Sequence, residues 1–317
     1  MALNPDYLIE RRRLGQRVSF WRWMTAIVLL VALIGAGIYA SGGADFERRT
    51  AHIAKLKISG VITGDEETLR LIREISESPA EAVMVAIESP GGTVTGAEAL
   101  YEALRKLAAK KPTVALIEGM AASGGYIAAL GTDHIFARET SIVGSIGVLF
   151  QYPDIVGLLD RVGVKVESIK SSPLKAAPSP IESATPESRA AIAALVQENY
   201  DWFKRLVRER RGLDDAGLAT VSDGRVFTGK QGVALGLVDA LGSDEQARLW
   251  LEKEKKLPRD LPIRDWRRHG LPERLGLAGL ARLSGFDRLA DILERLAAVP
   301  ETQLLDGVLV LWHPSAP

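Results

Sequence analysis

TVALI at residues 113–117, followed by GMAASGGY at residues 119–126, is the stretch that decides which fold this sequence is expected to adopt. The first run is apolar and β-branched, which predicts a buried strand, and the residues after Tyr126 are compatible with a helix. Ser123 therefore stands at a strand-to-helix turn with small residues around it. Such a turn lets a substrate backbone approach the hydroxyl closely and directs the first amides of a helix at the same point. A glycine-rich turn that only packs a helix on a sheet is the alternative.

The sequence on both sides of this turn alternates between strand-like and helix-like runs. Apolar runs predict strands at 53–62, 82–87, 134–137, 164–169 and 236–239. Apolar residues at helical spacing predict helices at 66–76 and 97–109, and a run rich in alanine, leucine, glutamate and arginine predicts a long helix at 186–211. Strands that alternate with helices predict an α/β domain whose sheet is largely parallel and is covered by helices.

Composition excludes several classes of function. Lysine plus arginine and aspartate plus glutamate each number 40, so the formal net charge is zero, which argues against nucleic acid as the main partner. The absence of cysteine excludes disulfides, thiolate metal sites and cysteine nucleophiles. The four histidines (His52, His134, His269 and His313) have no paired spacing on one helix face. We therefore expect no metal and no cofactor.

The N-terminal region has the pattern of a membrane anchor. Residues 23–40 form an uncharged apolar run that is just long enough to cross a bilayer as a helix. Arginines precede it at Arg11, Arg12, Arg13, Arg17 and Arg22. The positive-inside bias then keeps the N-terminus in the cytoplasm and places the remainder outside it. A cleaved signal peptide is the alternative, although the apolar run is long for one.

The expected organisation has five parts. These are a cytoplasmic segment (1–22), a transmembrane anchor (23–40), a linker (41–51), the α/β domain (52–260) and a tail with a short amphipathic helix (261–317). The amphipathic helix is predicted by Phe286, Leu289, Leu293 and Leu296.

A second glycine-rich motif is expected to face Ser123. SPGG at residues 89–92 follows a buried strand, and functional crevices of parallel sheets lie at the carboxyl ends of strands. An oxyanion hole needs two N–H donors, and the candidates are the backbone amides of Gly91, Gly92 and Gly124. The serine also needs a base. His134 begins a strand and suits packing better, whereas a lysine within 166–178 can serve if burial populates its neutral amine.

Four motifs together resemble one family. SPGG at 89–92, GMAASGGY at 119–126, GSIGV at 144–148 and GRVFTG at 224–229 are similar to the bacterial signal peptide peptidase family of the SppA type, over residues 53–244. The resemblance implies a ClpP/crotonase-like fold and a serine–lysine dyad, with Ser123 as nucleophile, Lys175 as general base and Ser145 orienting the lysine amine. It also implies a ring-like or dome-like homo-oligomer. Glu88 departs from the small or amide residue common in relatives, and the tail beyond 262 matches poorly.

Three lysines compete for the role of base. Lys165 lies in the predicted strand and should face solvent or a helix, and Lys170 is followed by two serines that favour the charged amine. Lys175 has only apolar neighbours and is flanked by Pro173 and Pro178, which stiffen the loop. Desolvation disfavours an ammonium group, so Lys175 is the predicted base.

These features predict a membrane-anchored serine endopeptidase that degrades remnant signal peptides after protein export. It would be anchored in the bacterial inner membrane with its catalytic domain on the periplasmic side. Its partners would be signal peptides or other unfolded apolar peptides, membrane lipid around the anchor, and further copies of the chain. The alternatives are a related serine–lysine peptidase acting on a membrane partner protein, an inactive membrane scaffold, and an acyl-CoA enzyme of the crotonase type.

Overall fold

The computed structural model describes residues 19–31, 50–266 and 309–311. Residues 19–31 form a helix whose side chains are exposed. Within the described ranges, no helix combines the length and the apolar character needed to cross a membrane. Residues 32–40 of the predicted anchor and the predicted amphipathic helix around 286–296 lie outside the described residues.

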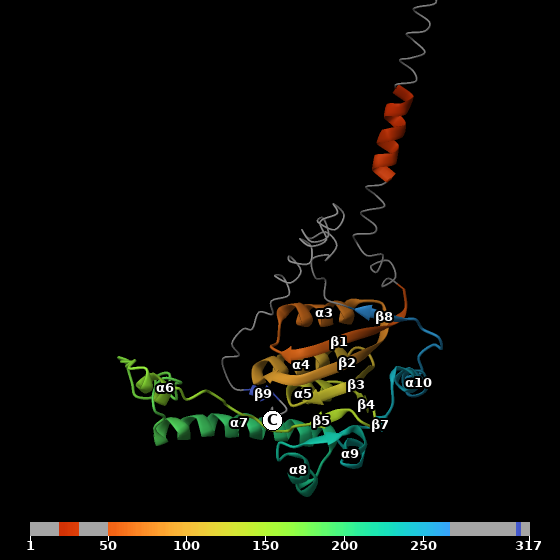
Figure 1. Ribbon diagram of the computed structural model, residues 1–317. Coiled ribbons are helices and arrows are strands. Elements are labelled where there is room, and N and C mark those ends of the chain that lie inside the picture. Colours follow the sequence, from red (N-terminus) through yellow and green to blue (C-terminus); the bar gives the residue numbers. More distant parts are fainter. Residues whose placement is uncertain (1–18, 32–49, 267–308, 312–317) are drawn as a thin grey trace, which may run out of the picture.

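A twisted sheet forms the centre of the domain (Figure 1). Its main path has the order β6-β5-β3-β2-β1-β8. These strands are β1 (His52–Ile62), β2 (Ala80–Thr93), β3 (Thr113–Ala122), β5 (Ile142–Gly144), β6 (Val226–Thr228) and β8 (Ile263–Trp266). Beside this path lie β4 (His134–Ala137), β7 (Ala240–Leu241) and β9 (Leu309–Leu311). The described pairings are parallel except β5 with β6 and β2 with β9, which confirms the predicted α/β class with a largely parallel sheet.

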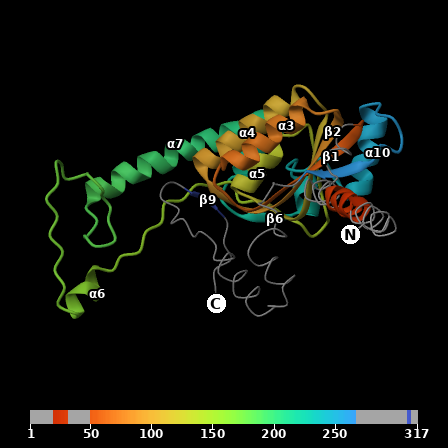
Figure 2. The same cartoon turned by 90° about the horizontal axis from the view of Figure 1, so that it is seen from above.

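Helices cover the sheet unequally on its two faces (Figure 2). The larger layer contains α3 (Glu66–Glu77), α4 (Val94–Ala108), α5 (Gly124–Leu130) and the carboxyl half of α7 (Pro186–Arg211). The opposite face is covered by α10 (Asp244–Glu254), which buries Ala247 and Leu251 against Ile53, Met84 and Leu116. Three short helices complete the described part: α6 (Val156–Arg161), α8 (Asp215–Val221) and α9 (Gly229–Ala234).

Local signals in the sequence explain the helix boundaries. The Asp65 side chain accepts a hydrogen bond from the Thr68 amide and caps α3. In α7, Thr185 caps the amide of Ser188, Pro186 opens the first turn, and Gly212 ends the helix with a φ of 63°. These start and stop signals are why the predicted helix at 186–211 has the observed bounds.

One predicted strand has different bounds, and two are absent. β2 continues beyond the predicted 82–87 through SPGG to Thr93, so this motif lies within a strand and not in a turn after it. The pairing of β2 with β1 is irregular between Ser59 and Val61, which accommodates the motif as a bulge. Residues 164–169 form no strand. Residues 236–239 lie in a loop, and the short strand β7 follows at Ala240.

Residues 149–185, hereafter the arm, extend away from the sheet together with the amino-terminal end of α7 (Figures 1 and 2). Within the arm, the amide of Ile155 donates to the carbonyl of Pro180, which holds its two halves together. The arm exposes an unusual set of apolar side chains: Leu158, Val162, Val164, Val166, Ile169 and Leu174. Exposed apolar side chains gathered in this way are typical of surfaces that bind other molecules.

Candidate active site

Ser123 occupies the sharp turn between β3 and α5. Its backbone has φ 54° and ψ −117°, a region that residues other than glycine adopt at a cost of about 1–3 kcal/mol. Its amide donates to the carbonyl of Gly144, with 2.8 Å between nitrogen and oxygen. The side chain is buried, and among the described residues its Oγ has no hydrogen-bond partner. A strained turn that presents a lone serine hydroxyl is typical of nucleophiles in hydrolases.

The glycines after Ser123 let α5 pack directly on β2. A Cβ on Gly125 would lie 2.7 Å from the carbonyl oxygen of Ser89 and 3.2 Å from the Ser89 Cβ. Only glycine fits this close approach. The amides of Gly124 and Gly125 belong to the first turn of α5, where the geometry of a helix provides no intrahelical acceptor. They are therefore donors next to the nucleophile turn.

The carboxyl end of β2 lies beside this turn. Ser89 pairs with Ala121, two residues before Ser123, and the strand then continues through Gly91 and Gly92. Gly91 has a φ of 112°, and Gly92 has no space for a Cβ, which would lie 1.8 Å from the Ile62 carbonyl oxygen. The structure thus brings the predicted amide donors to the same edge of the sheet as Ser123.

Ser89 has a role that the sequence did not reveal. Its Oγ donates to the carbonyl of Gly60 at 2.7 Å and accepts the amide of Gly91 at 3.1 Å. The Gly91 amide is therefore engaged within the bulge, which leaves Gly92 and Gly124 as the predicted donors with no such side-chain acceptor. The Ser-Pro-Gly-Gly motif indicated a turn, but only the pairing of β1 with β2 shows which atoms the serine joins.

Ser145 lies directly behind the nucleophile turn. It follows Gly144, whose carbonyl accepts the Ser123 amide, and its own amide donates to the Arg225 carbonyl at 2.9 Å. Ser145 is buried and has a φ of 53°, so it too has a strained backbone. Two of the four family-like motifs, 144–148 and 224–229, therefore meet at the back of the Ser123 turn.

Lys175 is not near this site in its own chain. It lies in the arm, between α6 and the start of α7, and its side chain is exposed, unlike the apolar environment predicted for it. Its neighbours Pro173, Leu174 and Ala176 are exposed as well, so they do not enclose the amine. Lys170 forms an ion pair with Glu182. Ser123, Gly91, Gly92, Gly124 and Ser145 are thus brought together, and Lys175 is held apart.

His134 belongs to a packing cluster at the other end of the sheet. It pairs with Val114 at the start of β3, and its ring stacks on Trp250 with centroids 4.5 Å apart. Burial lowers the pKa of His134, and the Asp239 carboxylate, 3.8 Å from Nδ1, opposes this shift. Arg211 donates to both oxygens of Asp239 at 2.8 and 3.1 Å. This position excludes His134 from the Ser123 site.

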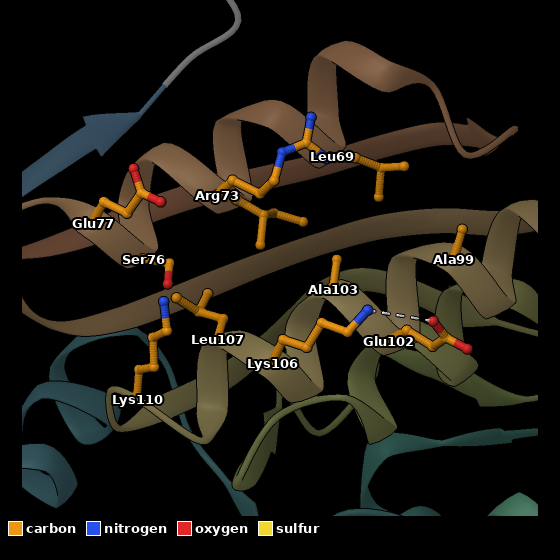
Figure 3. A pocket seen from close by; sticks show the side chains of 11 residues that line it. Leu69, Arg73, Ser76, Glu77, Ala99, Glu102, Ala103, Lys106, Leu107 and Lys110 are labelled. Carbon is orange, nitrogen blue, oxygen red and sulfur yellow. Dashed lines mark ion pairs between the residues drawn. The ribbon is translucent and has the colours of Figure 1, made fainter.

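A large groove lies elsewhere, between α3 and α4. It has a volume of about 520 Å³, and its lining includes Leu69, Ile72 and Leu107 with Arg73 and Lys106 at its rim (Figure 3). Lys106 pairs with Glu102. The groove contains neither the nucleophile turn nor any residue of the four motifs, so it is separate from the candidate active site.

The fold and the site together define a class, the serine peptidases with a ClpP-like fold. The model of the Clp protease family matches residues 67–142, which include β2, β3 and the turn at Ser123. The model of peptidase family S49 matches residues 105–258. The chain belongs to peptidase family S49.

Three relatives illustrate the similarity. Putative protease slr0021 of Synechocystis sp. is 37% identical over 200 residues, which cover 62% of this chain and 72% of the relative. Putative protease MJ0651 of Methanocaldococcus jannaschii is 33% identical, with 66% of each chain covered. Putative signal peptide peptidase SppA of Enterococcus faecium is 34% identical, with 65% of this chain and 64% of the relative covered. The similarity to Protease 4 of Salmonella typhi covers only 30% of that protein.

Proposed function

We propose that this chain is a membrane-anchored serine endopeptidase whose nucleophile is Ser123 and whose substrates are extended apolar peptides, including remnant signal peptides. The observation that carries the proposal is the Ser123 hydroxyl, which is buried, has no hydrogen-bond partner among the described residues, and is held by a strained turn at the carboxyl edge of the sheet. The similarity to the putative signal peptide peptidase of Enterococcus faecium supports the substrate class.

The chemistry follows from the groups around Ser123. Its Oγ attacks the scissile carbonyl while a base takes the hydroxyl proton, and a tetrahedral intermediate forms. The amides of Gly92 and Gly124 donate to the oxyanion. Collapse of the intermediate breaks the C–N bond, and the base returns the proton to the leaving amine. Water then hydrolyses the acyl-enzyme by the same route.

The proposed base is Lys175 of a second copy. Ser123 lies in the domain, whereas Lys175 lies in the arm, where it is exposed. The arm also exposes apolar residues such as Val166, Ile169 and Leu174. Docking of the arm on a neighbouring domain would bury these apolar residues. It would also desolvate the amine, which favours the neutral form that a general base needs. Ser145, behind the nucleophile turn, would then orient the incoming amine.

The proposed N-terminal anchor would hold the domain at the membrane, close to peptides that are released there. The apolar run 23–40 and the arginines before it favour a retained anchor, with the domain on the periplasmic side of the inner membrane. An enzyme tethered there would meet signal peptides where they are released. No cofactor enters the proposed mechanism.

Single variants test the assignment of nucleophile and base. Ser123→Ala and Lys175→Ala should each lower kcat on an apolar peptide by about 10³-fold or more. Lys175→Arg should also lack peptidase activity, because a guanidinium does not give up its proton near neutral pH. Lys170→Ala is the matched control, since Lys170 is already paired with Glu182, and it should retain most activity. Near-normal turnover by Lys175→Ala would remove the lysine from the mechanism.

Mixing the two inactive variants tests whether the lysine comes from another copy. Ser123→Ala subunits keep Lys175, and Lys175→Ala subunits keep Ser123. After co-refolding in equal amounts, about a quarter of the sites should have both groups if each site draws them from adjacent copies of a closed assembly. Absence of any recovered activity, with mixed assemblies shown by mass spectrometry, would contradict sharing between copies. A fluorophosphonate probe that fails to label Ser123 would instead indicate an inactive scaffold.

A further inference from the structure

The groove between α3 and α4 has an apolar lining that a further helix could cover. Leu69, Ile72 and Leu107 line it, and the last two are buried. Ala99 and Ala103 lie one turn apart on α4 and line the same groove (Figure 3). Because alanine side chains are short, another helix can approach α4 closely along this face. The volume of about 520 Å³ lies within the range of sites that bind ligands.

Charged side chains border the apolar lining. Arg73 of α3 and Lys106 and Lys110 of α4 carry positive charge, whereas Glu77 and Glu102 carry negative charge. Three positive and two negative groups leave the groove with a net charge of +1. A matching ligand is therefore apolar on one face, carries charges of both signs on its flanks, and has a small excess of negative charge. An amphipathic helix has this character, and helices bind grooves of this kind through their apolar faces.

One segment of the chain itself matches this description. Residues 286–298 (FDRLADILERLAA) lie outside the described residues, and their sequence predicts an amphipathic helix. Phe286, Leu289, Leu293 and Leu296 recur at helical spacing, and the segment contains three acidic and two basic residues. Its net charge of −1 complements that of the groove. A helix of this length would measure about 20 Å, which is close to the length of α4.

The connection that contains this segment begins and ends at the helix layer on which the groove lies. It leaves β8 at Trp266, which is buried in the same apolar cluster as Ile72 and Leu107 of the groove. It returns to β9 at Leu309, which pairs with Thr93, the N-cap residue of α4. β9 also contacts α4. Both described ends of the connection are therefore tied to elements that surround the groove.

We propose that the groove between α3 and α4 is the docking site for residues 286–298 of the same chain, which bind it as an amphipathic helix. The flanking residues 267–285 and 299–308 can extend to about 60 Å and about 30 Å, so they can join the docked helix to both β8 and β9. Docking would cover the apolar lining and hold this part of the chain on the domain. The interaction goes beyond the proposed peptidase function and does not require that Ser123 be catalytic.

Disulfide cross-linking in the full chain tests the proposal, because the native sequence has no cysteine. In a Ser123→Ala background, Ala103→Cys is combined with Leu289→Cys or Leu293→Cys, on the predicted apolar face. Arg295→Cys, on the opposite face, is the matched control partner. Under mild oxidation, the faster apolar-face pair should cross-link within one chain at least about tenfold more quickly than the control pair. Equal rates for the three pairs, or cross-links mainly between copies, would overturn the proposal.

Hydrogen exchange supplies a second measurement that needs no cross-link. Ala103→Trp would fill the groove, so the amides of residues 286–298 should exchange at least about tenfold faster than in the parent chain. Glu98→Trp is the control, because Glu98 is exposed on α4 and does not line the groove. It should leave the exchange of the segment unchanged. An unprotected segment in the parent, or unchanged protection in Ala103→Trp, would also overturn the proposal.

Docking of the segment and the proposed peptidase function fail in different ways. If the segment cross-links to the groove but the protein with Ser123 restored hydrolyses no peptide, the docking site stands and the peptidase function fails. If peptides are hydrolysed while the segment neither cross-links nor shows protection, the peptidase function stands and the docking site fails.

Discussion

At the residue scale, the backbone conformation of Ser123 lowers the stability of the protein. Its φ of 54° is strained for serine, and its Oγ makes no hydrogen bond within the described chain to offset that strain. Strain of this kind persists where the surrounding structure enforces it. Here the Ser123 amide donates a hydrogen bond to the Gly144 carbonyl, and Gly125 packs against Ser89.

Ser123→Gly should therefore be more stable than Ser123→Ala. Glycine adopts positive φ freely, so the substitution releases the backbone strain, although glycine also increases the entropy of the unfolded chain. The net result should be a free energy of unfolding about 1 kcal/mol higher for Ser123→Gly than for Ser123→Ala. Urea denaturation of both inactive variants measures the difference. Ala122→Gly, one residue earlier in β3 and without positive φ, is the control and should lose stability. A Ser123→Gly protein less stable than Ser123→Ala would show that the turn is not strained.

At the element scale, the site depends on how α5 lies on β2. The contact is made through backbone, with Gly125 above the carbonyl of Ser89, and this fixes the height of the nucleophile turn over the edge of the sheet. α5 buries all of its side chains in this position. A side-chain atom added between α5 and β2 should therefore displace Ser123.

Gly125→Ala should lower both stability and turnover. The new Cβ would lie 2.7 Å from the Ser89 carbonyl oxygen, and relief of that overlap should destabilise the protein by about 1–3 kcal/mol. The shift of α5 should reduce kcat more than it raises KM, because it misplaces the nucleophile. Gly157→Ala is the matched control: Gly157 lies in α6 with nothing within 4 Å of the added Cβ, so this change should not destabilise. Full activity of Gly125→Ala would contradict the role of this contact.

At the scale of the whole molecule, the arm is the feature that its own domain does not explain. It holds Lys175 and several exposed apolar residues outside the domain, and Ile169 is fully exposed. A monomer would leave this surface in water, and the candidate site would lack its proposed base. Assembly would bury the exposed apolar surface and would also supply the base to the candidate site.

If the proposed assembly forms, Ile169→Ser combined with Val164→Ser should dissociate it without unfolding the chain. Both side chains are exposed, so the free energy of unfolding of a monomer should change by less than about 0.5 kcal/mol. Light scattering should show smaller particles, and peptidase activity should fall with the loss of Lys175 from the neighbouring site. Leu249→Ser, at a half-exposed position in α10, is the control and should leave the assembly intact. An active monomer would refute the shared site.

Much of the fold and part of the site could be predicted from the sequence because their determinants are local. The composition of 186–211 and the apolar run at 134–137 predicted α7 and β4, and the small residues around Ser123 indicated the strand-to-helix turn. Four separate motifs resemble a single family, and this resemblance groups Ser123 with Ser145 from the sequence alone. Membership of peptidase family S49 agrees with that prediction.

The sequence by itself determined the strand-to-helix turn at Ser123, the strand β4 and the long helix α7, since each depends on neighbours a few positions away. Only the tertiary structure decided that β2 runs through Pro90, because the bulge opposite Gly60 comes from pairing with another strand. It also decided that Ser89 engages the Gly91 amide and that β9 pairs with β2 at Gly91–Thr93. Lys175 seemed enclosed by apolar neighbours in the sequence, yet it is exposed, because adjacent residues in an extended arm bury nothing unless another surface packs against them.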